Sequence, residues 1–154
     1  MNDPRQGMAQ SHAVAMQSLR ADLLVLLLLA ATRLIFHLLT NNQYGFHRDE
    51  LATIDDARHL AWGFVAYPPL TPLIARAAME WFGTSLVAMR FFSGLAQAIA
   101  MVLTGLMARE LGGSRWAQVV AALAMAVAPL SMLMGAMFQY VSFDLILLAN
   151  HLMP

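Results

Sequence analysis

The sequence predicts an all-α, polytopic membrane protein with three full transmembrane helices and a truncated fourth. Of its 154 residues, 60% are hydrophobic and only 12% are charged, so a water-soluble fold would have too little polar surface to cover its exterior. Three apolar runs are each long enough to cross a hydrocarbon core of about 30 Å as a helix. Between the first two runs, apolar residues recur at helical spacing, which indicates two short interfacial helices.

The net charge and the cysteine count exclude several classes of function. The formal net charge is zero, so no basic field would attract nucleic acid. The chain has no cysteine, and therefore no disulfide framework, thiolate nucleophile or cysteine-based metal site. We expect no cofactor.

The first apolar run, Leu23 to Leu39, is interrupted only by Arg33 and His37. The polar residues that follow it do not form a small-residue cleavage site, which favours a retained signal anchor over a cleaved signal peptide. Arg33 and His37 lie one turn apart, and we expect them to face protein or to reach the interface.

Three further runs follow the loop at residues 41–85. Leu86 to Met107 and Trp116 to Phe143 are each long enough to span, and Pro129 predicts a kink in the second of them. Leu145 to Met153 reaches only about 14 Å as a helix, which predicts a truncated fourth span and a chain that is the N-terminal part of a longer protein. Small residues in the first of these runs predict close helix contact: Gly94, Ala98 and Gly105.

The orientation rests on arginine counts near the ends of the spans. Four arginines fall on the N-terminal side of the membrane and three on the other, so the counts nearly balance. Acidic residues gather in the loop at 41–85. We place residues 1–20 in the cytoplasm as a tail and the loop outside.

The loop at 41–85 predicts two amphipathic helices. The first runs from Asp49 to Trp62 and carries Asp49 and Glu50 in its first turn, where carboxylates complement the helix dipole. The second begins with Thr71 as N-cap and ends at Gly83. Helices of this kind suit the membrane surface, which would place these carboxylates at the depth of lipid phosphates.

Several segments together resemble one family of membrane enzymes. The chain is similar to the bacterial protein-mannosyltransferase-like glycosyltransferases of family 39, which belong to the GT-C superfamily and include the transferase that adds aminoarabinose to lipid A. The resemblance covers about residues 20 to 154, and the matching segments are Tyr44–Leu51, Ala57–Gly63, Pro68–Leu73, Ala108–Gly113 and Phe143–Leu145.

The resemblance implies an inverting transfer of a sugar from a polyprenyl-phosphate donor to an acceptor hydroxyl on a lipid, glycan or protein. The reaction would take place at the periplasmic face of the bacterial inner membrane, among membrane lipids. Residues 21–154 would then be the N-terminal part of a GT-C transmembrane module. Two alternatives stay open: a non-catalytic remnant of such an enzyme, or a fragment of a membrane transporter.

The resemblance also assigns catalytic residues. Asp49 is the candidate base, Glu50 is its supporting partner, and Asp144 at the mouth of the fourth span would line the same cavity. The plainer interpretation of Asp49 and Glu50 is that they cap a helix. Together with His47 they also make a weak signal for a metal site, which we do not predict.

Three more residues are candidates for binding the donor. Arg48 and Arg58 can grip a phosphate through their guanidinium groups. Arg58 has the plainer alternative of a helical ion pair with Asp55. Several relatives have a lysine before the paired prolines, where it can contact phosphate, whereas this chain has the uncharged Tyr67.

Overall fold

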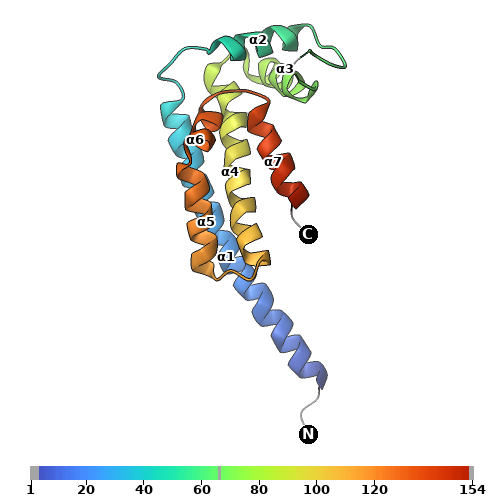
Figure 1. The fold of residues 1–154 in the computed structure, drawn as a ribbon, viewed down its shortest axis with the longest axis vertical. Coiled ribbons are helices and arrows are strands. Elements are labelled where there is room, and N and C mark those ends of the chain that lie inside the picture. The colour runs from blue at the N-terminus through green and yellow to red at the C-terminus, as the bar shows by residue number, and fades with distance from the viewer. Residues whose placement is uncertain (1–3, 66, 153–154) are drawn as a thin grey trace.

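The computed structural model describes residues 4–65 and 67–152, and this part of the chain is helical without any β-strand (Figure 1). The all-α fold class is therefore confirmed. The helices are α1 (Pro4–Thr40), α2 (Arg48–Arg58), α3 (Leu70–Phe82), α4 (Leu86–Glu110), α5 (Arg115–Val127), α6 (Pro129–Ala136) and α7 (Val141–Leu152).

Two of the described helices are long and apolar enough to cross a membrane. They are α4 and the segment Met16–Thr40 of α1, each 25 residues long, or about 37 Å as a helix. α4 packs against α1, α5, α6 and α7, so it is the central helix of the bundle (Figure 1). The outward face of α1 consists of exposed large apolar side chains, as a lipid-facing helix requires: Leu24, Leu27, Leu28, Ile35 and Leu39.

The run Trp116 to Phe143 does not form one straight helix. α5 and α6 meet at a 62° bend, and the pair counts as a third span only if the two helices are taken together. This bend confirms the kink predicted at Pro129. Its cause is that proline has no N–H to continue the helical hydrogen bonds. α7 begins at Val141, earlier than the expected start at Leu145. The number of spans beyond two stays a prediction.

α2 and α3 lie across one end of the bundle (Figure 1). Their bounds differ from the prediction at three points, the first being that α2 begins at Arg48 rather than Asp49. α2 ends at Arg58 rather than Trp62, and α3 begins at Leu70 with Pro69 as its N-cap, so the prediction of Thr71 as N-cap was wrong. Pro69 already has helical φ and ψ angles, and Thr71 is buried inside the first turn. The predicted stop of α3 at Gly83 is confirmed.

A small apolar core joins this layer to the bundle. It brings together residues of α2, α3 and α4 and the segment between α6 and α7, so the layer packs against the bundle rather than extending freely from it: Ile54, Ala57, Ala75, Ala78, Met89 and Phe138.

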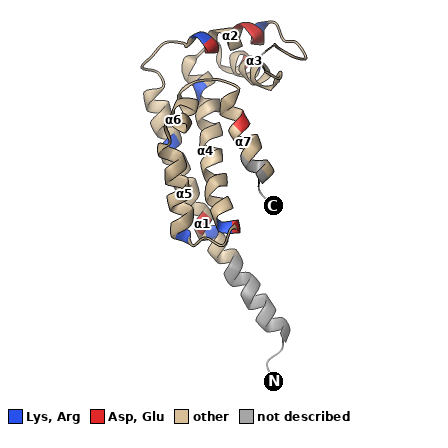
Figure 2. Cartoon of the chain, viewed as in Figure 1, with Lys and Arg blue, Asp and Glu red and all other residues tan. Residues whose placement is uncertain are grey.

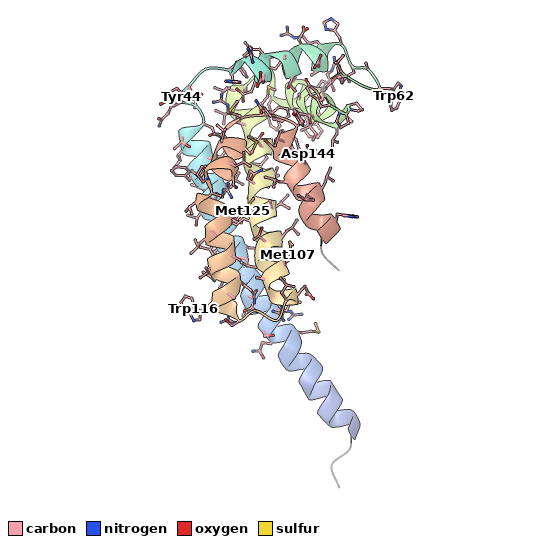
Figure 3. The ribbon with its side chains drawn as sticks, viewed as in Figure 1. Tyr44, Trp62, Met107, Trp116, Met125 and Asp144 are labelled. Atoms are coloured by element: carbon pink, nitrogen blue, oxygen red, sulfur yellow. The ribbon has the colours of Figure 1, made fainter. Side chains whose placement is uncertain are left out.

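Charged residues lie mainly at the two ends of the bundle (Figure 2). At the end away from α2 and α3, the buried carboxylate of Asp22 accepts hydrogen bonds from Arg109 at 2.6 Å, Arg115 at 2.6 Å and Gln118 at 3.2 Å. Trp116 lies at this end and Trp62 at the other (Figure 3). Tryptophan at both ends of an apolar bundle is typical of a membrane protein.

Glycines let the helices approach closely at the centre of the bundle. A Cβ at Gly94 would lie 3.2 Å from Leu34 Cδ1 and 3.5 Å from His37 Cβ, and one at Gly105 would lie 2.5 Å from Leu26. The predicted close contact of α4 at these two positions is confirmed. His37 faces protein, as expected, and its imidazole lies against Gly135 of α6.

We expect Gly135→Ala to destabilise the protein by about 1–3 kcal/mol, because the new methyl group would overlap the enclosed imidazole of His37. Thermal unfolding of the purified protein in detergent measures the loss. Gly63→Ala is the control, because a Cβ there meets open space. Equal unfolding midpoints for the two variants would contradict the packing described.

Candidate functional site

The two carboxylates of the Asp49-Glu50 pair point to different surroundings. Glu50 is fully buried and accepts four hydrogen bonds: Oε1 from Arg90 Nε at 2.8 Å and from the Phe138 N–H at 2.9 Å, and Oε2 from Arg90 Nη2 at 2.7 Å and from the His47 N–H at 2.8 Å. The bond to His47 closes a capping box at the start of α2. The capping interpretation therefore holds for Glu50, whose carboxylate is occupied by protein donors.

Arg90 uses all five of its N–H groups in this arrangement. Besides its two bonds to Glu50, Nη1 donates to the carbonyls of Asn41 at 2.6 Å and Tyr44 at 3.2 Å, and Nη2 donates to Gly45 at 2.9 Å. The pair thus fixes the turn after α1, the start of α2 and the segment after α6 onto α4.

The hydrogen bonds determine the charge state of Glu50. Burial alone would raise the pKa of its carboxyl, but the donors of Arg90 and the N–H groups of His47 and Phe138 outweigh burial. The pKa of Glu50 consequently lies below its ordinary value of 4.5, and the group is ionised at neutral pH.

Asp49 is the accessible member of the pair. Its side chain is 48% exposed, and Oδ2 accepts a hydrogen bond of 2.9 Å from Gln139 Nε2. Arg48 Nε lies 3.4 Å from Oδ1, and its side chain is 91% exposed. Asp49 is therefore held by a residue from a distant part of the chain while one side stays open to a ligand.

A second polar group lies along the same face of α2. The Tyr67 hydroxyl donates to Asp56 Oδ2 at 2.5 Å, and the Tyr67 ring stacks on Tyr140 with centroids 5.3 Å apart. Burial first, and then the carboxylates of Asp56 and Asp49, raise the pKa of Tyr67. The hydroxyl consequently stays protonated and acts as a donor. Asp49, Asp56, Tyr67 and Tyr140 form one polar cluster with Gln139, which we call the α2 face.

Arg58 lies away from the α2 face. It is the last residue of α2, about 15 Å along the helix from Arg48. Asp55 Oδ1 lies 3.8 Å from His59 Nδ1. Within the described structure, the side chain of Arg58 has no hydrogen bond or ion pair. The helical pair of Arg58 with Asp55 is not formed.

Asp144 lies in the first turn of α7, near the end of that helix that faces α2 and α3 (Figure 3). Its side chain is exposed, and its backbone N–H donates to Tyr140 at 3.2 Å. Among the described residues, no hydrogen bond or ion pair joins Asp144 to Asp49 or Glu50. Tyr140, in the turn immediately before α7, is the nearby residue that reaches the α2 face.

An open apolar groove of about 510 Å³ is lined by residues on both sides of Tyr67 in the chain. It contains no charged residue, and its floor is formed by the turn after α2 and the start of α3. A narrow apolar chain would fit such a groove, which is lined by Leu60, Ala61, Trp62, Pro68, Pro69, Leu70 and Leu73. Within the described residues, no group of three His, Asp or Glu side chains is placed to hold a metal ion.

The sequence did not reveal three residues that build this region. Arg90 is the one charge in the run Leu86 to Met107, and a charge inside an apolar span is itself a signal of function or pairing. Its partner, 40 residues earlier, is not readable from any spacing. Gln139 and Tyr140 follow an apolar stretch and have no pattern that would single them out.

Comparisons of the chain with protein-family models, with curated proteins and with solved structures give no match. The geometry of the α2 face therefore carries the functional argument.

We expect Glu50→Gln to lower the stability by roughly 3 kcal/mol at neutral pH, because it leaves Arg90 buried without a counter-charge. The depressed pKa of Glu50 contributes stability that is present above 4.5 and is lost as the pH falls through the folded-state pKa. The gap in unfolding midpoint between wild type and Glu50→Gln should consequently shrink at acid pH. Glu80→Gln, at an exposed pair with Arg76, is the control with little effect. A gap that widens in acid would contradict the assignment.

Proposed function

We propose that this chain belongs to a glycosyltransferase that moves a hexosyl or pentosyl group from a polyprenyl-phosphate donor to an acceptor hydroxyl. The observation that carries the proposal is Asp49: a half-exposed carboxylate, fixed by Gln139, at one end of an apolar bundle. A carboxylate so placed can meet a substrate whose head is in water and whose tail is in the bilayer.

In the proposed reaction, Asp49 is the general base. It accepts the proton of the acceptor hydroxyl as the hydroxyl oxygen bonds to the anomeric carbon from the side opposite the phosphate. The bond from the anomeric carbon to the phosphate oxygen breaks, and the lipid phosphate leaves with the electron pair. Configuration at the anomeric carbon is inverted. Glu50 supports this step indirectly, because it fixes the start of α2 through Arg90.

The surroundings of Asp49 suit a lipid-linked donor. The exposed guanidinium of Arg48 is available to the donor phosphate, and the Tyr67 hydroxyl lies beside the carboxylates that would face the sugar. The apolar groove next to Tyr67 offers a place for the first isoprene units. Arg58, at the far end of α2 from Arg48, is a further candidate for binding the donor phosphate, and Asp144 is a further candidate for the acceptor side.

The proposal includes a topology. α1, α4 and the bent pair α5–α6 are three spans, and α7 begins a fourth. The layer of α2 and α3 faces the periplasm of a bacterial cell, and the arginines around Asp22 face the cytoplasm.

We expect Asp49→Asn to lower sugar transfer by about 100-fold or more, because the amide cannot accept the proton. The assay uses membranes from cells that express the full gene and a polyprenyl-phosphate sugar that carries its radiolabel in the sugar, and it measures the label transferred to the acceptor after the unreacted lipid donor has been extracted. Asp55→Asn is the matched control, since Asp55 is an exposed carboxylate of the same helix outside the α2 face. Activity retained in Asp49→Asn at normal membrane levels excludes the base assignment. No transfer by the wild type across a panel of donors favours the remnant instead.

A second candidate, membrane transport, is favoured by a different observation. Transporters have broken spans with polar residues at membrane depth. The structure has a 62° bend between the apolar helices α5 and α6, and buried Arg33, Gln97 and Ser131 lie at or near this bend.

Transport predicts solute or ion flux into sealed proteoliposomes that contain the protein. Flux no greater than that of empty vesicles, for a panel of cations and small anions, would exclude it.

A further inference from the structure

The bend between α5 and α6 leaves a backbone group without its usual partner. Pro129 has no N–H, so the carbonyl of Met125, four residues earlier, cannot receive its helical hydrogen bond. Ala128, between the two helices, is extended with φ −60° and ψ 126°. In an apolar bundle no bulk water is available to satisfy such a carbonyl.

Arg33 of α1 reaches into this bend. Its Nη1 lies 3.5 Å from the Met125 carbonyl, and its Nη2 donates to the Ser131 carbonyl at 2.8 Å and to the Ser131 hydroxyl oxygen at 2.6 Å. The side chain is buried, and within the described structure it forms no ion pair with a carboxylate. A single guanidinium thus binds both sides of the break.

The polar contacts continue from the bend to the neighbouring helices. Ser131 donates through its hydroxyl to Gln97 Oε1 at 3.0 Å, and Gln97 Nε2 donates to the Ser142 carbonyl at 3.1 Å. At the other end of α6, Asn41 donates to the Gly135 carbonyl at 3.0 Å and Ser142 donates to the Met134 carbonyl at 2.7 Å. Both ends of α6 are therefore closed by side chains from α1, α4 and α7.

In addition to these hydrogen bonds, the positive charge of Arg33 is favourable at the C-terminal end of α5. The C-terminal end of α5 carries the negative end of its helix dipole, which a cation stabilises. In transporters with broken spans, such carbonyls and helix ends face a transported ion. Here a side chain of the protein occupies that place.

We propose that the guanidinium of Arg33 takes the place that a bound cation would have at the bend between α5 and α6. Through α6, it positions the segment after α6 against the α2 face. The segment at 137–140 supplies the Phe138 N–H to Glu50 and the Gln139 side chain to Asp49. Arg33 is a positioning residue, because it acts on these contacts through α6 and touches none of them. The proposal does not depend on sugar transfer, and it argues against an ion site at the bend.

A double-mutant cycle between Arg33→Met and Pro129→Ala tests the proposal on the whole chain in detergent. Arg33→Met should lower the unfolding midpoint by on the order of 5 °C, because the carbonyls at the bend lose their donor. Adding Pro129→Ala should recover part of that loss, because alanine supplies an N–H to the Met125 carbonyl while the Ser131 carbonyl and hydroxyl stay without the guanidinium. Absence of recovery would overturn the proposal.

Two further comparisons ensure that the double-mutant cycle either supports or refutes the proposal. If Arg33→Met alone does not accumulate in membranes, the double variant must accumulate, and its failure would refute the proposal. Arg90→Met is the matched control, since Arg90 is an equally buried arginine of the neighbouring helix α4 that binds carbonyls elsewhere. Rescue of Arg90→Met by Pro129→Ala would show a general effect of the alanine and would also refute it.

Crosslinking reports the positioning step separately. The chain has no cysteine, so Asp49→Cys with Gln139→Cys gives one reactive pair, at positions whose native side chains meet at 2.9 Å. A short bifunctional thiol reagent should join them efficiently in an otherwise native chain and several-fold less in the Arg33→Met background. An unchanged yield in Arg33→Met would contradict the positioning role.

Discussion

The ion pair between Glu50 and Arg90 is the contact on which the arrangement of this end of the molecule depends. Four segments that are separate in the sequence meet at it: the turn after α1, the first turn of α2, the helix α4, and the segment after α6. Two charges buried without water are costly unless their remaining donors and acceptors are satisfied. Here every N–H of the guanidinium and both oxygens of the carboxylate have partners. The geometry of the α2 face follows, because Asp49 immediately precedes Glu50 on a helix whose start is fixed by this ion pair.

The different roles of Asp49 and Glu50 show which features of this site the sequence can predict and which it cannot. Consecutive residues on a helix point about 100° apart, so a doublet at a helix start must send its side chains in different directions. The sequence does not say which of them turns inward, because that depends on Arg90, which lies 40 residues further on. The resemblance named Asp49 as the base and Glu50 as its partner, and the structure adds that the carboxylate of Glu50 is occupied by protein donors while that of Asp49 is accessible.

Local patterns predicted more than long-range contacts did. The apolar runs, the two short helices of the loop and the break at Pro129 follow from hydropathy, periodicity and the missing N–H of proline. The exceptions have physical reasons as well. Thr71 looked like an N-cap because it precedes a proline, but Pro69 already sets the helical φ angle. Gln139 had no signal at all, since its role arises only because the bend between α5 and α6 brings the segment after α6 to α2. The sequence does not predict residues whose role depends on contacts between distant parts of the chain.

The carboxylate of Asp22 shows what chain order implies for biogenesis. Its two arginine partners follow it by 87 and 93 residues, so they leave the ribosome about 4 to 19 seconds later at ordinary synthesis rates. The first apolar helix is therefore synthesised before either arginine that pairs with Asp22. The two ion pairs can form only after α4 and the start of α5 have been made.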